Sequence, residues 1–414
     1  MESEVAVLGA GLAGTATALE LARHGVPVTL IDQDELPLNR ASLRNEGKIH
    51  LGLIYANDPS LRTARLQLDG ALRFRSLLAR WIGSQTDRLQ RSSPFIYLVA
   101  DDSLLGVRAL ASHYHAVQAA YEAFIGGDPS RDYLGSRPSR LWRHCPLTGI
   151  RHFVRIERLI GAFSTAEVAI DTVELATLLR QAVADSSLIR FLPGRRVACV
   201  ERSDGGFRIE GGGAPGFWQV EAEQVVNALW EGRLAVDRTA GVTVEPGWVH
   251  RMKYRVIVRL PERLRGAPSV TMILGRYGDV VVRRDGTAYL SWYPAGLRGW
   301  THELSPPASW DAPCRGEPSA EEVRSVVFDT LRAIDAWYPG IGESEPLVAD
   351  AGIIVAYGRT DVDDASSALH DRSRVGVTSI DGYHSLDPGK LTTAPLFAEV
   401  AATRVLGVRQ GAPA

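Results

Sequence analysis

The stretch from Val5 to Asp32 restricts the fold of this 414-residue chain more than any other part of it. A short apolar run of strand length leads into the turn Gly9-Ala10-Gly11-Leu12-Ala13-Gly14, and a helical pattern then continues to Gly25. Glycines at this spacing make a tight turn, let a pyrophosphate approach the backbone and allow the helix to pack closely on the strand. The sequence therefore predicts a dinucleotide-binding βαβ unit.

The second strand of this unit ends at Asp32, whose carboxylate can accept hydrogen bonds from both hydroxyls of a ribose. The same charge would repel a ribose 2′-phosphate, so NADP fits poorly, whereas FAD and NAD both remain compatible with the pattern. The predicted nucleotide contacts are Gly9, Gly11, Leu12, Ala13, Gly14, Asp32 and Gln33.

Composition excludes several classes of protein. The formal net charge of −2 gives no global field that would attract nucleic acid or an anionic membrane, and no apolar run approaches the length of a membrane span. Three widely separated cysteines fit a reducing compartment and exclude a disulfide framework or a thiolate metal site. The first strand begins almost at Met1, which leaves no room for a secretion signal. We expect a cytoplasmic protein without a metal, a membrane span or a nucleic-acid partner.

Lysine is rare in this chain. Among 46 basic residues, counted as lysine plus arginine, only Lys48, Lys253 and Lys390 are lysines. Because arginine supplies nearly all of the positive charge, a remaining lysine can mark a place that needs a compact ammonium able to lose its proton. Chance survival of three lysines explains the count equally well.

Two further regions combine polar groups with glycine. Residues 44–55 interleave polar and apolar side chains and include Gly47 and Gly52, which allow the backbone to approach a flat or phosphorylated group closely. Residues 381–395 end in a glycine loop followed by Pro395, which fits the first position of a helix. A helix N-terminus reached through such a loop attracts anions, so the chain has one site of this kind near each end.

The intervening sequence predicts two different kinds of sheet. Residues 219–228 form a strand that ends at Asn227 and Ala228, and it would bring its end beside the first glycine turn if both belong to one sheet. Alternating apolar and polar residues between Tyr254 and Tyr293 predict an antiparallel sheet with one wet face.

Taken together, these motifs resemble those of the D-amino-acid oxidase superfamily of FAD-dependent oxidoreductases over essentially the whole chain. The turn at residues 9–14 with Asp32 resembles its ADP-binding fingerprint, and residues 389–395 (GKLTTAP) resemble the loop that brings a helix N-terminus to the flavin. Residues 44–55 are similar to a segment of the 2-hydroxyglutarate and glycerol-3-phosphate oxidising branches. The further FAD contacts that the resemblance implies are Arg44, Asn45, Glu46, Gly47, Lys48, Ile49, Val197, Asn227, Ala228, Gly389, Lys390, Leu391, Thr392 and Thr393.

The implied fold class is α/β, with a Rossmann-type FAD-binding domain and an α+β substrate domain built on an antiparallel sheet. The FAD-binding domain would comprise residues 1–80, 150–245 and 345–414, and the substrate domain residues 81–149 and 246–344. FAD is the expected cofactor, a small molecule the substrate, and oxygen or another acceptor the oxidant.

The sequence departs from the family at two places. The usual AAG after the strand ending at Asn227 is replaced by residues 228–232 (ALWEG), so no flavin contact is assigned to Trp230. The carboxylate-binding arginine expected just before the C-terminal loop is also missing, because Pro388 and Gly389 stand there. Arg359 is similar in placement to another family arginine and becomes the expected anion clamp.

The remaining catalytic candidates are assigned by their place in the pattern. Lys253 begins the antiparallel sheet that would cover the flavin, where it could promote oxygen reduction or meet an anionic substrate. His50 could donate a hydrogen bond to flavin or substrate. The pocket candidates are Tyr357, Tyr383 and His384.

We expect oxidation of an amine or amino acid to an imine by hydride transfer to flavin N5. Oxidation of a 2-hydroxy acid is the nearest alternative, and residues 44–55 favour it. A flavin-dependent monooxygenase or halogenase is less favoured, because the order Asp381-Gly382 reverses the Gly-Asp pair that those enzymes carry. A flavoprotein that binds FAD without turnover is the alternative outside enzymology.

Overall fold

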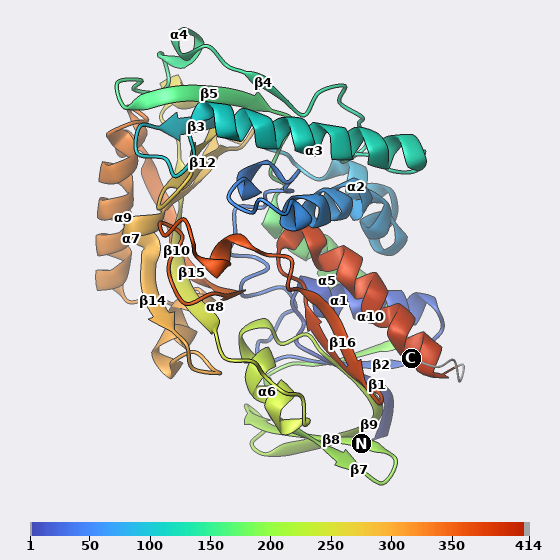
Figure 1. Cartoon of the computed structure of the whole chain (residues 1–414). Coiled ribbons are helices and arrows are strands. Elements are labelled where there is room, and N and C mark those ends of the chain that lie inside the picture. The colour runs from blue at the N-terminus through green and yellow to red at the C-terminus, as the bar shows by residue number, and fades with distance from the viewer. Residues whose placement is uncertain (1, 410–414) are drawn as a thin grey trace.

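Two β-sheets organise the computed structural model, which describes residues 2–409 (Figure 1). The strands of the first sheet are β1 (Glu2–Leu8), β2 (Val28–Ile31), β6 (Ile189–Leu192), β7 (Arg195–Ser203), β8 (Gly206–Gly213), β9 (Trp218–Asn227), β16 (Gly376–Ile380) and β17 (Tyr383–Asp387). The strands of the second sheet are β3 (Phe95–Ala100), β4 (Trp142–His144), β5 (Leu159–Thr165), β10 (Trp248–Arg259), β11 (Ser269–Ile273), β12 (Gly278–Val282), β13 (Thr287–Trp292), β14 (Leu297–Thr301) and β15 (Glu345–Tyr357). The α-helices are α1 (Leu12–Arg23), α2 (Arg62–Ile82), α3 (Val107–Gly127), α4 (Leu147–Ile150), α5 (Thr172–Asp185), α6 (Arg233–Thr239), α7 (Tyr293–Gly296), α8 (Asp311–Arg315), α9 (Ala320–Asp335) and α10 (Ala394–Arg409).

The first sheet joins the beginning, middle and end of the chain. Its strand order is β16-β17-β9-β1-β2-β6, and β17, β9, β1, β2 and β6 run parallel to one another. Leu8 pairs with both Ile31 and Asn227, and Asn227 also pairs with Ser385. The carboxyl ends of these strands therefore meet at one edge, where ligands of open parallel sheets bind.

Apolar burial explains why β1 occupies the centre of this sheet. Val5, Ala6, Val7 and Leu8 are completely buried, as expected for a parallel strand covered on both faces. Helices α1, α2, α5 and α10 share one apolar core on one side of the sheet, and Figure 1 shows α1 and α10 lying next to each other. The predicted α/β fold class with a Rossmann-type domain is confirmed.

The second sheet separates an apolar core from a polar face along β10. Met252, Tyr254 and Val256 point into a core that also contains residues of α9, which covers the outer side of this sheet in Figure 1. Because side chains alternate along a strand, Arg251, Lys253 and Arg255 share the opposite face. This polar face is turned toward the segment that follows β2, since the Arg255 side chain donates to the carbonyl of Leu43.

Two strands inside the predicted FAD-binding segments pair with the second sheet, and the domain limits themselves stay a prediction. Strand β5 (Leu159–Thr165) pairs with β3, and β15 (Glu345–Tyr357) pairs with β10, so both belong to the second sheet. The sequence assigned residues 150–245 and 345–414 to the FAD-binding domain. The difference arises because both strands are largely apolar, and an apolar strand does not reveal which sheet it will join.

None of the helices within residues 2–409 is both long enough and apolar enough to span a bilayer.

Candidate active site

A cleft opens where the carboxyl edge of the first sheet faces the polar side of β10. It is lined by the glycine turn at residues 9–13, by residues 228–232 and by residues 388–391, and from the second sheet by Lys253, Asp279 and Tyr289. Backbone hydrogen bonds from Gly9 to Ile31 and from Ala228 to Leu8, both 2.8 Å, hold the first two loops in place. The two glycine loops near the ends of the chain therefore line one cavity.

The three glycines of the turn have different roles. Gly9 has φ +91°, and a Cβ there would lie 2.6 Å from the carbonyl oxygen of Ala228. A Cβ on Gly14 would lie 1.9 Å from the carbonyl oxygen of Gly9, and Gly14 does not line the cleft. A Cβ on Gly11 would meet only the hydroxyl oxygen of Ser42, at 3.3 Å. Gly11 is thus the position where a ligand can approach the backbone, and the other two allow the chain to pack on itself.

Asp32 lies at the end of β2 with Gln33 beside it in the cleft lining. The backbone N–H groups of Ala10 and Asp34 donate to its two carboxylate oxygens, at 2.5 and 2.8 Å. Burial raises the pKa of Asp32 to about 6, and these two hydrogen bonds oppose the rise. Each oxygen retains a lone pair that a ribose hydroxyl could use.

Ser42 was not predicted as a site residue. Its hydroxyl accepts a hydrogen bond of 2.8 Å from the backbone N–H of Leu12, the first residue of α1. It therefore sits at the helix N-terminus, where a phosphate group would be favoured. No motif marks this position, because Ser42 lies 30 residues from Leu12 and reaches it only through the fold.

The C-terminal loop carries Gly389, Lys390 and Leu391 into the cleft and leads through a short 3-10 helix, η8 (Leu391–Thr393), into α10. No side chain caps the N-terminus of η8. Thr392 and Thr393 are fully buried, and their hydroxyls bind protein groups: the former interacts with the backbone of Lys48 and His50, the latter with the carbonyl of Pro388. Their side chains fix the loop, and only their backbone could face a ligand.

Residues 44–49 divide between the cleft and the protein interior. Those that line the cleft are Arg44, Asn45, Glu46 and Lys48. Ile49 is completely buried, and a Cβ on Gly47 would lie 2.1 Å from the carbonyl oxygen of Ile170. The Gly52 position similarly abuts the carbonyl oxygen of Ala64, at 2.6 Å. These two glycines accommodate neighbouring backbone, where the sequence suggested a flat or phosphorylated ligand.

Residues around β7 and β9 also divide between the cleft lining and the protein interior. Val197 and Ala228 line the cleft, whereas Asn227 is completely buried and its amide donates to Asp237 and Tyr383. Trp230 lines the cleft too, with its indole N–H donating to the carbonyl of Ile353.

All three lysines of the chain line this one cleft. Lys48 donates to Asp279 Oδ1 at 2.8 Å and to Thr271 Oγ1 at 2.6 Å. Lys253 donates to Ser291 Oγ at 3.2 Å. Burial lowers the pKa of Lys253, and it lowers the pKa of Lys390 to about 8. The three lysines of this chain are therefore gathered at one site.

His50 lies between two carboxylates. Its Nε2 is 3.7 Å from Glu46 Oε1, and its Nδ1 is 3.7 Å from Glu167 Oε1. Burial alone would raise the pKa of Glu46, but His50 and the charge of Lys390 hold it well below its ordinary value. Glu167 is fully buried and accepts a hydrogen bond from Tyr97. Both ring nitrogens of His50 therefore face a carboxylate.

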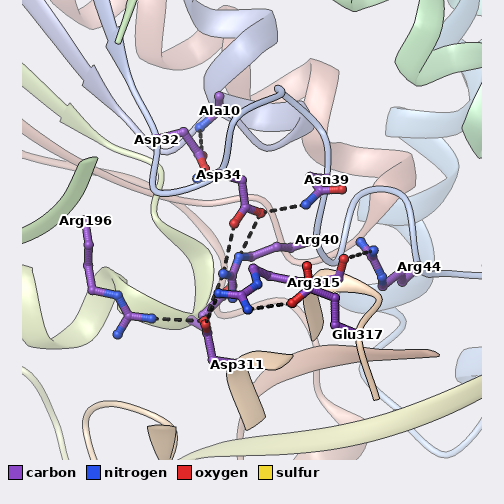
Figure 2. Close-up of polar contacts among 11 residues, drawn as sticks. Ala10, Asp32, Asp34, Asn39, Arg40, Arg44, Arg196, Asp311, Arg315 and Glu317 are labelled. Atoms are coloured by element: carbon purple, nitrogen blue, oxygen red, sulfur yellow. Dashed lines mark hydrogen bonds and ion pairs between the residues drawn. The ribbon is translucent and has the colours of Figure 1, made fainter. Parts of the chain in front are cut away.

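An ion-pair network closes the opposite part of the cleft (Figure 2). Arg40 binds Asp34 through two hydrogen bonds of 2.9 Å, and it reaches Asp311 at 2.9 Å and Glu231 at 3.7 Å. Asp311 opens α8, and the segment before it, residues 305–308, also lines the cleft. Arg196 joins the same carboxylate at 3.1 Å. Through Arg40, the segment at residues 305–311 is thereby attached to Asp34, two residues after Asp32.

Four predicted catalytic residues do not line the cleft. Arg359 is exposed on the loop after β15, and Tyr357 packs against Trp248 and Arg374. Tyr383 is buried in the first sheet and donates to Asp237. His384 contacts Ser379 and Gln224, and burial lowers its pKa to about 4. The structure gives these groups packing and hydrogen-bonding partners away from the cleft.

The polar groups and the backbone that line the cleft fit FAD. An open glycine position, a helix N-terminus and a carboxylate at the end of β2 suit the ADP portion, and the N-terminus of η8 suits the electron-rich end of the ring. Together the fold and this cleft define a flavoprotein oxidoreductase.

The sequence profile of the FAD dependent oxidoreductase family, DAO, matches residues 4–404, so the chain belongs to that family. Its members are FAD-dependent enzymes that oxidise CH–NH or CH–OH groups, which confirms the predicted family, cofactor and class of reaction.

Solved structures share this fold. Glycine oxidase from Geobacillus kaustophilus superposes with a TM-score of 0.68 at 15% identity, covering 100% of this chain and 96% of that one. FAD-bound L-alpha-glycerophosphate oxidase from Mycoplasma pneumoniae gives 0.66 at 16% identity, covering 98% and 95%. Among curated proteins, the tRNA 5-methylaminomethyl-2-thiouridine biosynthesis bifunctional protein of Chromohalobacter salexigens is 34% identical over 135 residues. That match covers 30% of this chain and only 18% of the relative.

Proposed function

We propose that this protein oxidises the C–N bond of an amine or amino acid to an imine, with oxygen or another acceptor completing the cycle. The observation that carries this proposal is the position of Lys253 and Lys390, which enter one cleft from the second sheet and from the loop before α10. A substrate held between these elements lies against the place where the C-terminal loop would meet the flavin.

FAD, when bound, supplies the hydride acceptor, N5 of its ring. For a neutral amine, the C–H bond breaks with its electron pair while the nitrogen lone pair forms the C=N bond, which leaves a protonated imine. The cationic side chains Lys253 and Lys390 favour the neutral over the protonated amine, because they repel an ammonium group. Burial lowers the pKa of both lysines, and neighbouring cations add a smaller effect in the same direction.

The proposal is tested by anaerobic mixing of the yellow holoenzyme with amines, amino acids and 2-hydroxy acids. Loss of flavin absorbance near its visible maximum with an amine or amino acid, together with trapping of the imine as a carbonyl product after hydrolysis, supports it. Absence of bleaching by every amine and amino acid, in a holoenzyme that dithionite still reduces, rejects it.

Oxidation of a 2-hydroxy acid is the second candidate, and the position of His50 favours it. An imidazole flanked by Glu46 and Glu167 can take the proton of a hydroxyl group and stabilise the resulting charge. Bleaching by 2-hydroxy acids alone would select this reaction.

A further inference from the structure

A set of cations lies just beyond Lys253 on the same face of β10. Arg251 stands two residues before Lys253, so the two side chains point in the same direction about 7 Å apart along the strand. Arg251 is only 2% exposed. One of its terminal nitrogens donates to Tyr293 Oη at 2.9 Å, and its Nε is buried without any hydrogen-bond partner.

The carboxylate nearest to Arg251 is shared with other groups. Asp361 Oδ1 lies 3.6 Å from Arg251 and accepts the 2.6 Å hydrogen bond of Tyr293, while its Oδ2 pairs with Arg276 at 3.0 Å. This carboxylate therefore compensates more than one guanidinium. Arg251 retains hydrogen-bonding capacity that the protein does not use.

Arg372 adds a second guanidinium to the same space. Within residues 2–409, the structure gives its side chain neither a hydrogen bond nor an ion pair, and only its backbone N–H is bound, by Thr63. Burial, together with the nearby charge of Arg251, lowers the pKa of Arg372 to about 10. Tyr55, whose hydroxyl is buried without a partner, lies close enough to influence the same group.

Lys390 connects this group of residues to the cleft. Its ammonium has no hydrogen-bonded side-chain partner among the described residues, and it experiences the charges of Arg372, Arg251 and Lys253. Tyr55 is linked to the cleft through its ring, which makes an edge-to-face contact with the His50 ring at a centroid distance of 5.5 Å. The group therefore lies behind Lys253, Lys390 and His50, which line the cleft where substrate oxidation is proposed.

Positive charge exceeds negative charge at this end of the cleft. Asp279 is bound to Lys48, and Asp361 is shared, so Glu46 is the carboxylate that remains for Lys390. A single carboxylate on the substrate has two oxygens and can therefore engage Arg251 and Arg372 together. Lys253 and Lys390 would still share one protein carboxylate, Glu46.

We propose that the substrate carries two carboxylates, one bound by Arg251 and Arg372 and the other attracted by Lys390 next to the oxidised carbon. The substrate class is then an acidic amino acid or its N-substituted derivative. This inference rests on the proposed oxidation at the same cleft and specifies which amino acids enter it.

The first test measures binding without turnover. Glutarate, butyrate and n-butylamine cannot undergo the proposed oxidation, and each is titrated into the holoenzyme while the flavin spectrum reports binding. We expect glutarate to bind at least tenfold more tightly than butyrate, and n-butylamine to bind weakest. Equal affinity for glutarate and butyrate would overturn the inference.

The second test uses variants. Arg251→Gln and Arg372→Gln should each weaken glutarate binding by roughly 10- to 100-fold, because each removes a charged hydrogen bond. Arg263→Gln is the matched control, since Arg263 is exposed and pairs with Glu343 on the far side of the second sheet. If Arg251→Gln loses FAD, Arg372→Gln and Arg372→Lys carry the test. Unchanged glutarate affinity in Arg372→Gln would refute the assignment.

The two proposals fail in different ways. Selective glutarate binding without bleaching by glutamate, aspartate or iminodiacetate would reject C–N oxidation and leave the two-carboxylate site intact. Bleaching by alanine, sarcosine and n-butylamine as efficient as that by the dicarboxylates would support C–N oxidation and reject the two-carboxylate site.

Discussion

Lys48 and Asp279 form a largely buried ion pair between the segment that follows β2 and strand β12, with 2.8 Å between Nζ and Oδ1. Lys48 also lies 4.0 Å from the centroid of the Phe95 ring and is 2% exposed. Burial would raise the pKa of Asp279, but the charge of Lys48 holds it below its ordinary value. The pair ties the segment after Asp32 to the sheet that covers the cleft.

The first prediction concerns this pair. Asp279→Asn should destabilise the protein by about 3 kcal/mol, because it leaves a buried ammonium without its counter-charge. Chemical denaturation of the apo-protein measures the loss. The double variant Lys48→Met/Asp279→Leu should recover most of it, and a double variant as unstable as Asp279→Asn would contradict the electrostatic explanation.

Asp32 gives a pH dependence of FAD binding. Its pKa in the folded apo-protein is raised from 3.8 to about 6, so folding favours the protonated carboxyl, and this contribution to stability is lost as the pH rises from about 4 to about 6. Ribose hydroxyls donate to the ionised form. FAD affinity should therefore increase as the pH rises through 6 and should be roughly fivefold weaker at pH 5 than at pH 6, following the ionised fraction of Asp32. Fluorescence titration of the apo-protein measures this, and Asp32→Asn should remove the dependence.

Lys253 should govern the oxidative half of the cycle. Electron transfer to oxygen creates negative charge, which a nearby ammonium stabilises. We expect Lys253→Met to slow reoxidation of the reduced enzyme by oxygen roughly 10- to 100-fold. FAD content should stay unchanged, and Lys253→Arg should restore part of the rate. Stopped-flow mixing with oxygenated buffer gives the rate constant, and a normal rate in Lys253→Met would exclude this role.

The ion pairs around Arg40 should retain the cofactor. Asp311→Asn weakens the attachment of residues 305–311, and we expect it to raise the FAD dissociation rate roughly fivefold to 30-fold, equivalent to about 1 to 2 kcal/mol. An excess of a flavin-binding trap protein measures that rate. Glu317→Gln is the control, since Glu317 pairs with Arg315 at the surface and does not reach Arg40. Equal dissociation rates in both variants would reject the retention role.

Local patterns reveal the nucleotide half of the site better than the substrate half. The contacts around Gly11 and Asp32 lie within one βαβ unit, so spacing alone locates them. Ser42 and Arg372 carry no such signal, because each reaches its partners only after distant segments meet. For Arg251 the sequence does contain a local signal. Arg251 alternates with Lys253 along a strand whose intervening residues are apolar, and this pattern indicates a charged face.

For two residues near the C-terminal loop, by contrast, the sequence suggests a place in the pocket that the structure does not give them. Tyr383 and His384 are pocket candidates in the sequence, and they precede the loop directly. Parallel pairing of β17 with β9 buries both before the chain reaches the cleft at Pro388. Proximity along the chain therefore did not give proximity to the site, since every strand residue here has packed neighbours on both faces.

Gly70 in α2 supports the C-terminal loop by having no side chain. A Cβ at this position would lie 2.9 Å from both the carbonyl oxygen of Thr392 and the Cγ2 of Thr393. On helix propensity alone, Gly70→Ala should stabilise α2 by about 0.5 to 1 kcal/mol. The short contact with backbone instead forces the loop to move, so we expect a lower melting temperature and at least tenfold weaker FAD binding. Gly126→Ala, in α3 with open space around it, is the matched control and should be neutral or stabilising. FAD affinity in Gly70→Ala equal to that of the Gly126→Ala control would show that the loop tolerates the displacement.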